Sequence, residues 1–155
     1  MKWVTREKAK VDRIACPWLI RRFVDSAAEF LFVPPEMVRQ VAESEDAIPL
    51  DAAGVELTRY REGNKEFVSF DAIITKYGLT DPALLELAKI VRGADAKISD
   101  APPESAGLEA AAIGFRGVAG DDFENMKLQF PTYDALYQYC ADRLKGTARL
   151  EHAQK

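Results

Sequence analysis

Apolar residues recur with helical spacing in several parts of the chain, and the strongest pattern lies between residues 82 and 92. Leucine, alanine and valine recur there at intervals of three or four residues, which predicts a helix with one buried face. Asp81-Pro82 precedes the pattern and Gly93 follows it, and both are typical of helix boundaries. We therefore expect a helix from Pro82 to Gly93. Its predicted buried residues are Leu84, Leu85, Ala88 and Val91.

Weaker patterns predict the other elements. Alternating or continuous apolar residues indicate strands, and apolar residues three or four positions apart indicate helices. Glu62-Gly63-Asn64 separates two alternating segments, which is typical of a β-hairpin. The expected strands are Lys2–Thr5, Glu29–Val33, Val55–Arg61 and Lys65–Phe70. The further expected helices are Pro17–Asp25, Pro35–Glu43, Ala72–Tyr77 with Asp71 as its cap, Ser105–Phe115 and Thr132–Leu144.

The order of these elements predicts an α+β fold, because strands and helices are mixed at first and only helices follow. We expect a small, mostly antiparallel sheet packed against several helices, and a helical C-terminal half. The hairpin is the clearest pair of strands in this fold. We interpret residues 1–145 as a single domain and residues 146–155 as a polar C-terminal tail.

Composition narrows the class of protein. Of the 155 residues, 48% are hydrophobic and 30% are charged, which is ordinary for a soluble globular domain. The formal net charge of −4 argues against an extensive nucleic-acid surface, so direct DNA binding is not expected. No apolar run approaches the ~20 residues that span a bilayer, and the N-terminus lacks a hydrophobic signal-peptide core. We therefore expect a cytoplasmic protein without membrane contact.

Cys16-Pro17 is the most informative local feature of the sequence. Proline favours the first position of a helix and moves the preceding residue out of helical geometry. Cys16 is therefore predicted to cap a helix that begins at Pro17. A thiol there faces the positive end of the helix dipole, which lowers its pKa and attracts anions. The alternative is a buried cysteine that only packs, as we expect for Cys140 in the last helix.

Arginines surround this predicted helix start. Seven lysines and arginines lie among the first 22 residues, against two acidic residues. The forked donors of arginine match the oxygens of chromate, sulfate and phosphate. The alternative for Arg21 and Arg22 is an exposed helix face, paired with Asp25 or Glu29. The predicted ligand-binding residues are Arg13, Cys16, Trp18, Arg21, Arg22, Arg92 and Asp95, and Cys16 is also the candidate catalytic residue.

Several common types of site have no sequence signature here. The chain has no CxxC motif, its single histidine is His152, and its two cysteines are far apart, so neither a zinc site nor a disulfide is expected. It also contains no P-loop, GxSxG or HExxH motif. The glycine-rich segment 114–120 lacks the strand–turn–helix context of a nucleotide site. We therefore predict no metal and no cofactor.

Three groups of motifs follow one another along nearly the whole chain. They are Val11–Asp25 with Phe30–Pro34, Ser69–Asp71 with Lys76–Leu84, and Ala88–Asp95 with Glu104–Glu109 and Tyr133–Tyr137. Together they resemble the chromate-resistance protein family, whose domain occurs alone or as the C-terminal part of ChrB-type regulators. The resemblance implies a link to bacterial chromate resistance and, in fused members, a role in chromate-responsive regulation.

The chain departs from the family pattern at positions that bear on metal binding. Many members carry histidine in the hairpin before the Ser69–Asp71 stretch, a cysteine near its second strand, and histidine at the position of Arg92. Here the first strand of the hairpin holds Arg59 and Arg61 instead. The resemblance therefore implies a hypothesis in which arginine has converted a cation site of relatives into an anion site.

Three hypotheses about function follow. The first is a cytoplasmic sensor or accessory domain, linked to chromate resistance, that binds a small oxyanion or related ligand at the start of the Pro17 helix. The second is a redox enzyme that uses the Cys16 thiol against chromate or another oxidant. The third is a protein-interaction module of a transcriptional regulator, whose DNA-binding part resides in another chain. A homo-oligomer is compatible with each of them.

Overall fold

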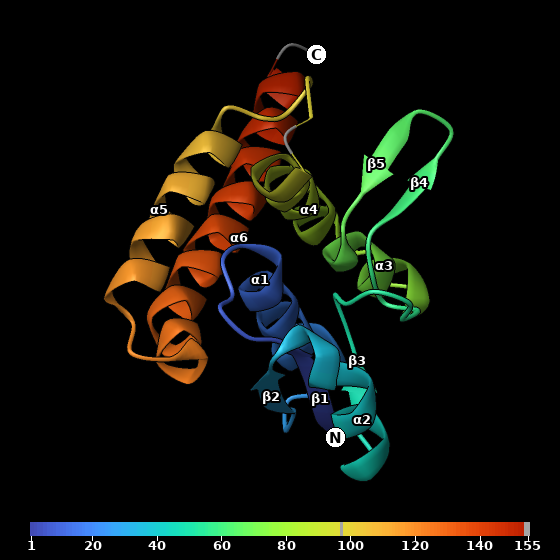
Figure 1. The fold of residues 1–155 in the computed structure, drawn as a ribbon. Helices are drawn as coiled ribbons and strands as arrows, with labels where there is room; N and C mark the ends of the chain where they lie inside the picture. Colours follow the sequence, from blue (N-terminus) through green and yellow to red (C-terminus); the bar gives the residue numbers. More distant parts are fainter. Residues whose placement is uncertain (97, 154–155) are drawn as a thin grey trace.

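Two groups of elements make up the fold: a small sheet with short helices in the N-terminal half, and long helices in the C-terminal half (Figure 1). The computed structural model describes residues 1–96 and 98–153. An α+β fold with a helical C-terminal half is therefore confirmed. None of the helices within the described residues combines the length and apolar character that a membrane crossing requires.

The larger sheet is parallel, so the expectation of a mostly antiparallel sheet is wrong for it. Its central strand β1 (Lys2–Arg6) pairs in parallel with β2 (Glu29–Val33) on one side and with β3 (Ile48–Pro49) on the other. Helical segments connect each strand to the next and return the chain to the same end of the sheet, which makes neighbouring strands parallel. These segments are α1 (Asp12–Leu19) with the π-helical turn η1 (Ile20–Val24), and the 3-10 turn η2 (Pro35–Met37) with α2 (Val38–Ser44).

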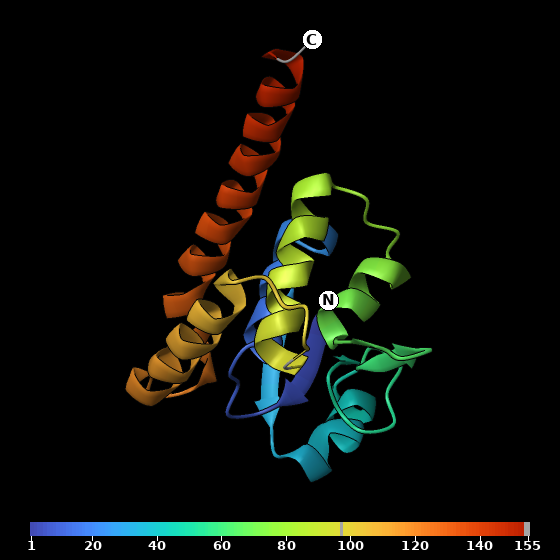
Figure 2. The same cartoon turned by 90° about the horizontal axis from the view of Figure 1, so that it is seen from above.

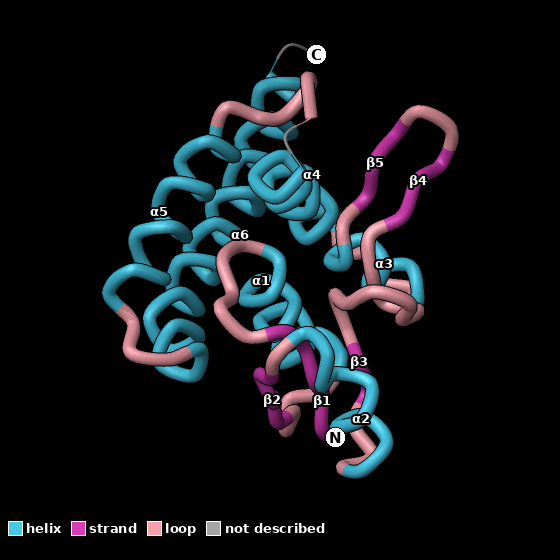
Figure 3. Tube along the Cα trace, viewed as in Figure 1, coloured by secondary structure: helices cyan, strands magenta, loops and turns pink. Residues whose placement is uncertain are grey.

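The predicted hairpin is present, but it forms a separate two-stranded sheet. β4 (Tyr60–Glu62) and β5 (Lys65–Phe67) pair in antiparallel fashion around a turn in which Gly63 has a φ of 62°. Both strands are shorter than the sequence predicts. Tyr60 and Phe67 stack across the pair with ring centroids 4.9 Å apart. The hairpin projects beside the helices α3 and α4 and lies away from the parallel sheet (Figure 3).

Four further helices follow the hairpin: α3 (Ser69–Lys76), α4 (Pro82–Ala96), α5 (Glu104–Val118) and α6 (Asp122–Ala153). The prediction of α4 is confirmed, although Leu85 is 41% exposed and Leu87 and Ile90 are buried instead. Gly93 does not end this helix. A Cβ atom at Gly93 would lie 2.4 Å from the Ser105 Oγ, so glycine is needed there to let α5 approach α4.

The last helix begins ten residues before the predicted start at Thr132 and continues past Leu144 to Ala153. Pro131 lies inside it, although proline removes one backbone hydrogen bond and usually interrupts a helix. Pro131 and the residue four positions earlier, Lys127, are both exposed, so water reaches the unpaired carbonyl group. Figure 2 shows α6 along the side of the molecule, with its C-terminal turns extending past the other helices.

The prediction that a helix begins at Pro17 is also wrong. α1 begins at Asp12, which places Pro17 at its sixth position and Cys16 in its interior. Proline removes only one hydrogen bond at this point, the one to the Arg13 carbonyl. All residues of α1 except Arg13 are buried, and the helix packs against α3, α4 and α6. The hydrophobic burial of α1 therefore outweighs the local preference of Pro17 for a helix start.

A stripe of polar side chains on α6 holds the loop that leads into α1. The Asp122 carboxylate accepts hydrogen bonds from the backbone N–H groups of Lys8 (2.9 Å) and Ala9 (2.7 Å). Further along α6, side chains donate to three consecutive loop carbonyls. These are the bonds from Asn125 to Ala9 (3.0 Å), from Gln129 to Lys10 (3.4 Å) and from Tyr133 to Val11 (3.3 Å). We call Asp122, Asn125, Gln129 and Tyr133 the polar stripe.

The polar stripe predicts an unequal cost of removing two amide side chains of α6. Asn125 is 1% exposed, and its Oδ1 also accepts a hydrogen bond from Gln129 at 2.6 Å. Replacing Asn125 with alanine leaves buried groups unpaired on both sides, so we expect the free energy of unfolding to fall by about 2 kcal/mol. Chemical denaturation measures this change.

Gln138→Ala is the matched control on the same helix. Gln138 is exposed and its amide bonds only to Asp142. Its removal should change the free energy of unfolding by no more than about 0.5 kcal/mol. Equal losses for the two variants would show that the buried bonds to the loop contribute nothing to stability.

Candidate functional site

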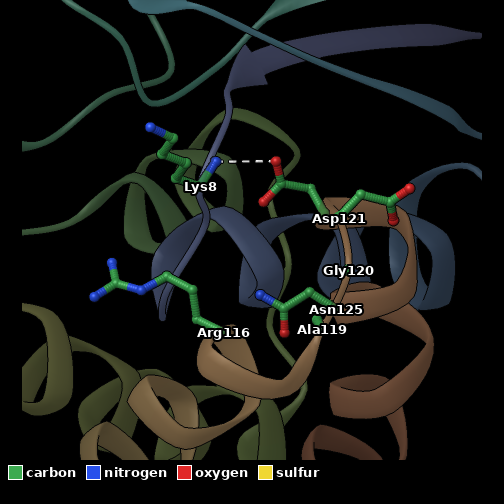
Figure 4. A pocket seen from close by; sticks show the side chains of 7 residues that line it. Lys8, Arg116, Ala119, Gly120, Asp121 and Asn125 are labelled. Atoms are coloured by element: carbon green, nitrogen blue, oxygen red, sulfur yellow. Dashed lines mark hydrogen bonds between the residues drawn. The ribbon is translucent and has the colours of Figure 1, made fainter.

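Two neighbouring cavities open around the start of α1 and the end of α5, and both are lined by Arg116. We call the first, of about 340 Å³, the α1 pocket, and the second, of about 330 Å³, the α6 pocket. The α1 pocket is lined by Lys10, Val11, Asp12, Arg13, Arg59, Asp95, Ile113 and Arg116. The α6 pocket is lined by Lys8, Arg116, Ala119, Gly120, Asp121, Asp122 and Asn125 (Figure 4).

The α6 pocket is formed mainly by groups that already have partners. Asp122 is occupied by the loop amides, and Asp121 accepts the backbone N–H of Glu124 at 2.8 Å. The side chains of Lys8 and Arg116 extend toward the same side of this pocket (Figure 4). Arg116 thus lines both pockets, and Lys8 adds a second cationic side chain to the α6 pocket.

Four cationic side chains converge on the α1 pocket from different parts of the chain. Lys10 comes from the loop before α1, Arg13 from its first turn, Arg59 from the segment before β4, and Arg116 from the end of α5. Carboxylates lie within 4.0 Å of the first three. Within the part of the chain that the structure describes, Arg116 has no such partner. The lining of the pocket therefore contains four cationic side chains and two carboxylates, those of Asp12 and Asp95.

The Asp12 carboxylate lines this pocket but faces the core of the protein. It is 2% exposed and accepts hydrogen bonds from the backbone N–H groups of Ser69 (2.9 Å) and Phe70 (3.3 Å). These groups belong to the first turn of α3, which has no side-chain cap of its own at Val68. Asp12 thus caps α3 from another helix. Burial raises the pKa of Asp12 well above its ordinary value, and nearby Asp51 raises it further.

Asp51 joins this cap to two arginines. Its Oδ1 accepts a hydrogen bond from the Ser69 hydroxyl at 2.8 Å, and its Oδ2 lies 3.5 Å from Arg6 and 3.6 Å from Arg13. Asp51 has a φ of 47°, a left-handed conformation that aspartate adopts more readily than most residues. The two guanidinium groups offset the charge of the buried Asp51 carboxylate.

Asp95 lies at the opposite wall of the α1 pocket, with a side chain that is 13% exposed. Its Oδ2 is 3.4 Å from the Nη2 of Arg59, and the backbone N–H of Asp12 also favours the ionised carboxylate. Asp95 and Asp12, the first residue of α1, line the same cavity. Burial is the main reason that its pKa is raised, followed by the charge of Asp51.

Cys16 is not the low-pKa thiol that the sequence predicts. It is fully buried inside α1, and its thiol donates a hydrogen bond to the Asp12 Oδ1 at 3.4 Å. Burial raises the pKa of Cys16 well above its ordinary value, and the Asp12 charge adds to this effect. Without a helix N-terminus beside it, the thiol has no group that stabilises the thiolate.

The structure places the remaining predicted residues away from the pocket. Arg92 makes a bidentate pair with Asp71 at 3.0 and 2.8 Å, and that carboxylate also accepts the Val68 backbone N–H. Because α3 begins at Ser69, Asp71 is its third residue. The prediction that Asp71 caps a helix starting at Ala72 is therefore wrong. The bidentate pair uses the donors by which Arg92 was expected to bind a ligand.

Trp18, Arg21 and Arg22 form a third group, against α6. The Trp18 Nε1 donates to the Asp134 Oδ1 at 2.8 Å, and Arg22 makes a bidentate pair with the same carboxylate at 2.9 Å. Arg21 donates to the Ala28 carbonyl at 3.2 Å and packs over the Phe30 ring. Of the seven predicted ligand-binding residues, only Arg13 and Asp95 line the α1 pocket.

The list of predicted ligand-binding residues omits three cationic residues of the pocket, Lys10, Arg59 and Arg116. Arg59 entered only through the anion-site hypothesis that the family resemblance implies. A local signal was present for Arg116, which is the only cation in helix α5. The approach of Arg59 and Arg116 to the start of α1 depends on the tertiary fold. Among the described residues, no group of three histidine, cysteine, aspartate or glutamate side chains is arranged to hold a metal ion.

Comparison with known proteins confirms the predicted resemblance. The family model of the ChrB C-terminal domain matches residues 3–140. The chain is 38% identical over 140 residues to Protein ChrB of Cupriavidus metallidurans, in an alignment that covers 89% of this chain and 40% of that protein. The chain therefore spans about two fifths of the length of this relative. No solved structure matches the chain.

Two arginine–aspartate pairs of the same geometry predict different losses of stability. The Arg92–Asp71 pair is 13% and 7% exposed, whereas the Arg22–Asp134 pair is 43% and 46% exposed. Arg92→Met leaves a buried carboxylate unpaired and should reduce the free energy of unfolding by about 3 kcal/mol. Arg22→Met should cost no more than about 1 kcal/mol. Denaturation of both variants checks the difference, and a larger loss for Arg22→Met would contradict this account.

The buried Cys16 predicts an unreactive thiol. In a Cys140→Ser variant, which leaves Cys16 as the single cysteine, we expect a thiol reagent to react only as fast as the protein opens or unfolds. Adding denaturant should therefore accelerate the reaction by orders of magnitude. The measurement is the rate of thiol modification with and without denaturant. Rapid modification of the folded protein at neutral pH would contradict the burial of Cys16.

Proposed function

The chain belongs to the ChrB C-terminal domain family, and on this premise we propose that it is a cytoplasmic sensor or accessory domain that binds a small tetrahedral oxyanion in the α1 pocket. Its membership of the family links the chain to chromate resistance. The observation that carries the proposal is the convergence of four cationic side chains on one cavity of about 340 Å³. Forked guanidinium groups are well suited to oxyanions, because each can donate two parallel hydrogen bonds.

The position of Arg13 supports this assignment. The Arg13 Nε is buried and, among the described residues, has no hydrogen-bond partner. A buried donor without a partner costs about 1–3 kcal/mol, and a ligand that accepts from it recovers this energy. Burial lowers the pKa of Arg13, although arginine keeps its charge at any physiological pH. Arg13 thus offers a charged donor that the fold leaves unused.

The start of α1 supports an anion in a second way. The first backbone N–H groups of a helix have no partner within it, and the helix dipole is positive at that end. The helix begins at Asp12, five residues before Pro17, so the electrostatic attraction for an anion is expected at Asp12. Lys10 and Arg13 flank this position on either side.

The alternative of a redox enzyme loses its physical basis, because Cys16 is buried and its pKa is raised. The alternative of a protein-interaction module gains one observation. Ile113 and Val118 of α5 are 48% and 73% exposed beside the pocket, and exposed apolar side chains of this size are typical of contact surfaces. We therefore retain a partner protein as the second candidate, compatible with a domain that spans two fifths of its relative.

A panel of oxyanions tests the proposal. Those of chromate, sulfate, phosphate and molybdate that bind should raise the melting temperature of the protein, and at equal concentration the tighter ligand should raise it more, because a ligand that binds only the folded state stabilises it. Sodium chloride at equal ionic strength is the control for screening. We expect a shift with at least one oxyanion and none with chloride.

Variants locate the binding site. Arg116→Gln should weaken the oxyanion several-fold without a loss of stability, because this exposed side chain pairs with no described carboxylate. Arg39→Gln, on an exposed part of α2, is the matched control and should leave the affinity unchanged. Equal affinities of both variants and the unmodified protein would place the anion outside the α1 pocket.

A further inference from the structure

Within this proposed function, the carboxylate of Asp95 occupies a part of the α1 pocket where a bound oxyanion would also be stabilised. It accepts a hydrogen bond from Arg59 at 3.4 Å and lines the same cavity as Asp12, the first residue of α1. A bound anion would use the same guanidinium group and the same cavity. The pocket thus already contains an internal anion, one that is fixed to the end of α4.

We propose that Asp95 is an internal competitor for the oxyanion, and that binding releases the carboxylate from Arg59 and protonates it. The ligand then receives the freed guanidinium of Arg59 and the start of α1. The proton comes from solvent and neutralises a charge that would otherwise repel the ligand. This inference rests on the proposed function and adds its regulation: the affinity for the oxyanion depends on pH.

The contact between Asp95 and Arg59 is weak enough to be exchanged. It consists of one hydrogen bond of 3.4 Å, and the Arg59 side chain is 57% exposed. The bidentate pair of Arg92 and Asp71, in contrast, has two bonds of 3.0 and 2.8 Å and is mostly buried. An exposed single contact contributes little to stability, so its loss is easily offset by a bound dianion.

The surroundings of Asp95 favour its protonation. Burial and the Asp51 carboxylate raise its pKa more than Arg59, Lys10 and the Asp12 amide lower it. A tetrahedral dianion in the pocket adds further negative charge and raises the pKa of Asp95 again. The charged groups that face Asp95 from the surrounding elements are Lys10, Asp12, Arg13, Asp51, Arg59 and Arg116.

The affinity for the oxyanion depends on the ionisation of Asp95. At high pH the Asp95 carboxylate is ionised and competes with the ligand, and at low pH it is neutral. The affinity should therefore rise as the pH falls, by up to about tenfold per pH unit when one proton is taken up. Sulfate is the appropriate probe, because it keeps both charges over the relevant range, whereas phosphate and chromate take up protons themselves.

Titration calorimetry with sulfate tests the proposal on the unmodified protein. Titrations in buffers of different ionisation enthalpy count the protons taken up on binding. We expect proton uptake and an affinity that rises from mildly alkaline to mildly acidic pH. Binding without either effect would overturn the role of Asp95 and leave the oxyanion site intact. An absence of sulfate, phosphate, chromate and molybdate binding at every pH would overturn the proposed function, and this inference with it.

Variants assign the proton to Asp95. Asp95→Asn should bind sulfate roughly fivefold more tightly at neutral pH, about the upper limit for an exposed ion pair, and should lose the pH dependence. Asp95→Glu keeps the charge and should keep the pH dependence. Glu86→Gln, which removes a carboxylate 2.9 Å from Lys89 on the same helix α4 but outside the pocket, is the matched control and should behave as the unmodified protein does. Unchanged or weaker binding by a folded Asp95→Asn variant would overturn the proposal.

Discussion

The polar stripe of α6 is the interaction on which the rest of the structure depends. A carboxylate, two amides and a phenol hold four consecutive loop residues, Lys8 to Val11, more than a hundred positions earlier in the chain. Lys8 has a φ of 62°, an uncommon conformation that the surrounding hydrogen bonds maintain. Because Val11 directly precedes α1, the stripe determines where that helix starts. It thereby positions Lys10 and Arg13, which line the α1 pocket.

Three contacts between α1, α3 and α4 connect these helices in a closed circuit. Asp95 of α4 lines the α1 pocket together with Asp12, and Asp12 of α1 caps the start of α3. Asp71 of α3 is in turn paired with Arg92, which returns the circuit to α4. Each contact joins two helices, and a buried cap whose partner is lost leaves an unpaired charge. The three helices therefore hold a single relative arrangement.

The sequence predicts those features that depend on local periodicity. The spacing of apolar residues locates α4, and the turn residues locate the hairpin. Rules for single residues fail where the fold as a whole opposes them. Pro17 lies inside a buried helix, Pro131 lies at an exposed position inside α6, and Gly93 marks a close contact between helices. The parallel sheet was also missed, although alternating strands and helices are the usual sign of parallel strands.

The candidate site was only partly predictable for the same reason. Arg13 could be found because it is adjacent in sequence to the start of α1, and Asp95 because it follows a clear helix. Arg59 and Arg116 reach the pocket from elements whose approach to α1 no local pattern records. The structure does place a carboxylate in the cavity at the start of α1. It is Asp95, a residue of α4, so a ligand that displaced this carboxylate would also act on the helix that completes the circuit.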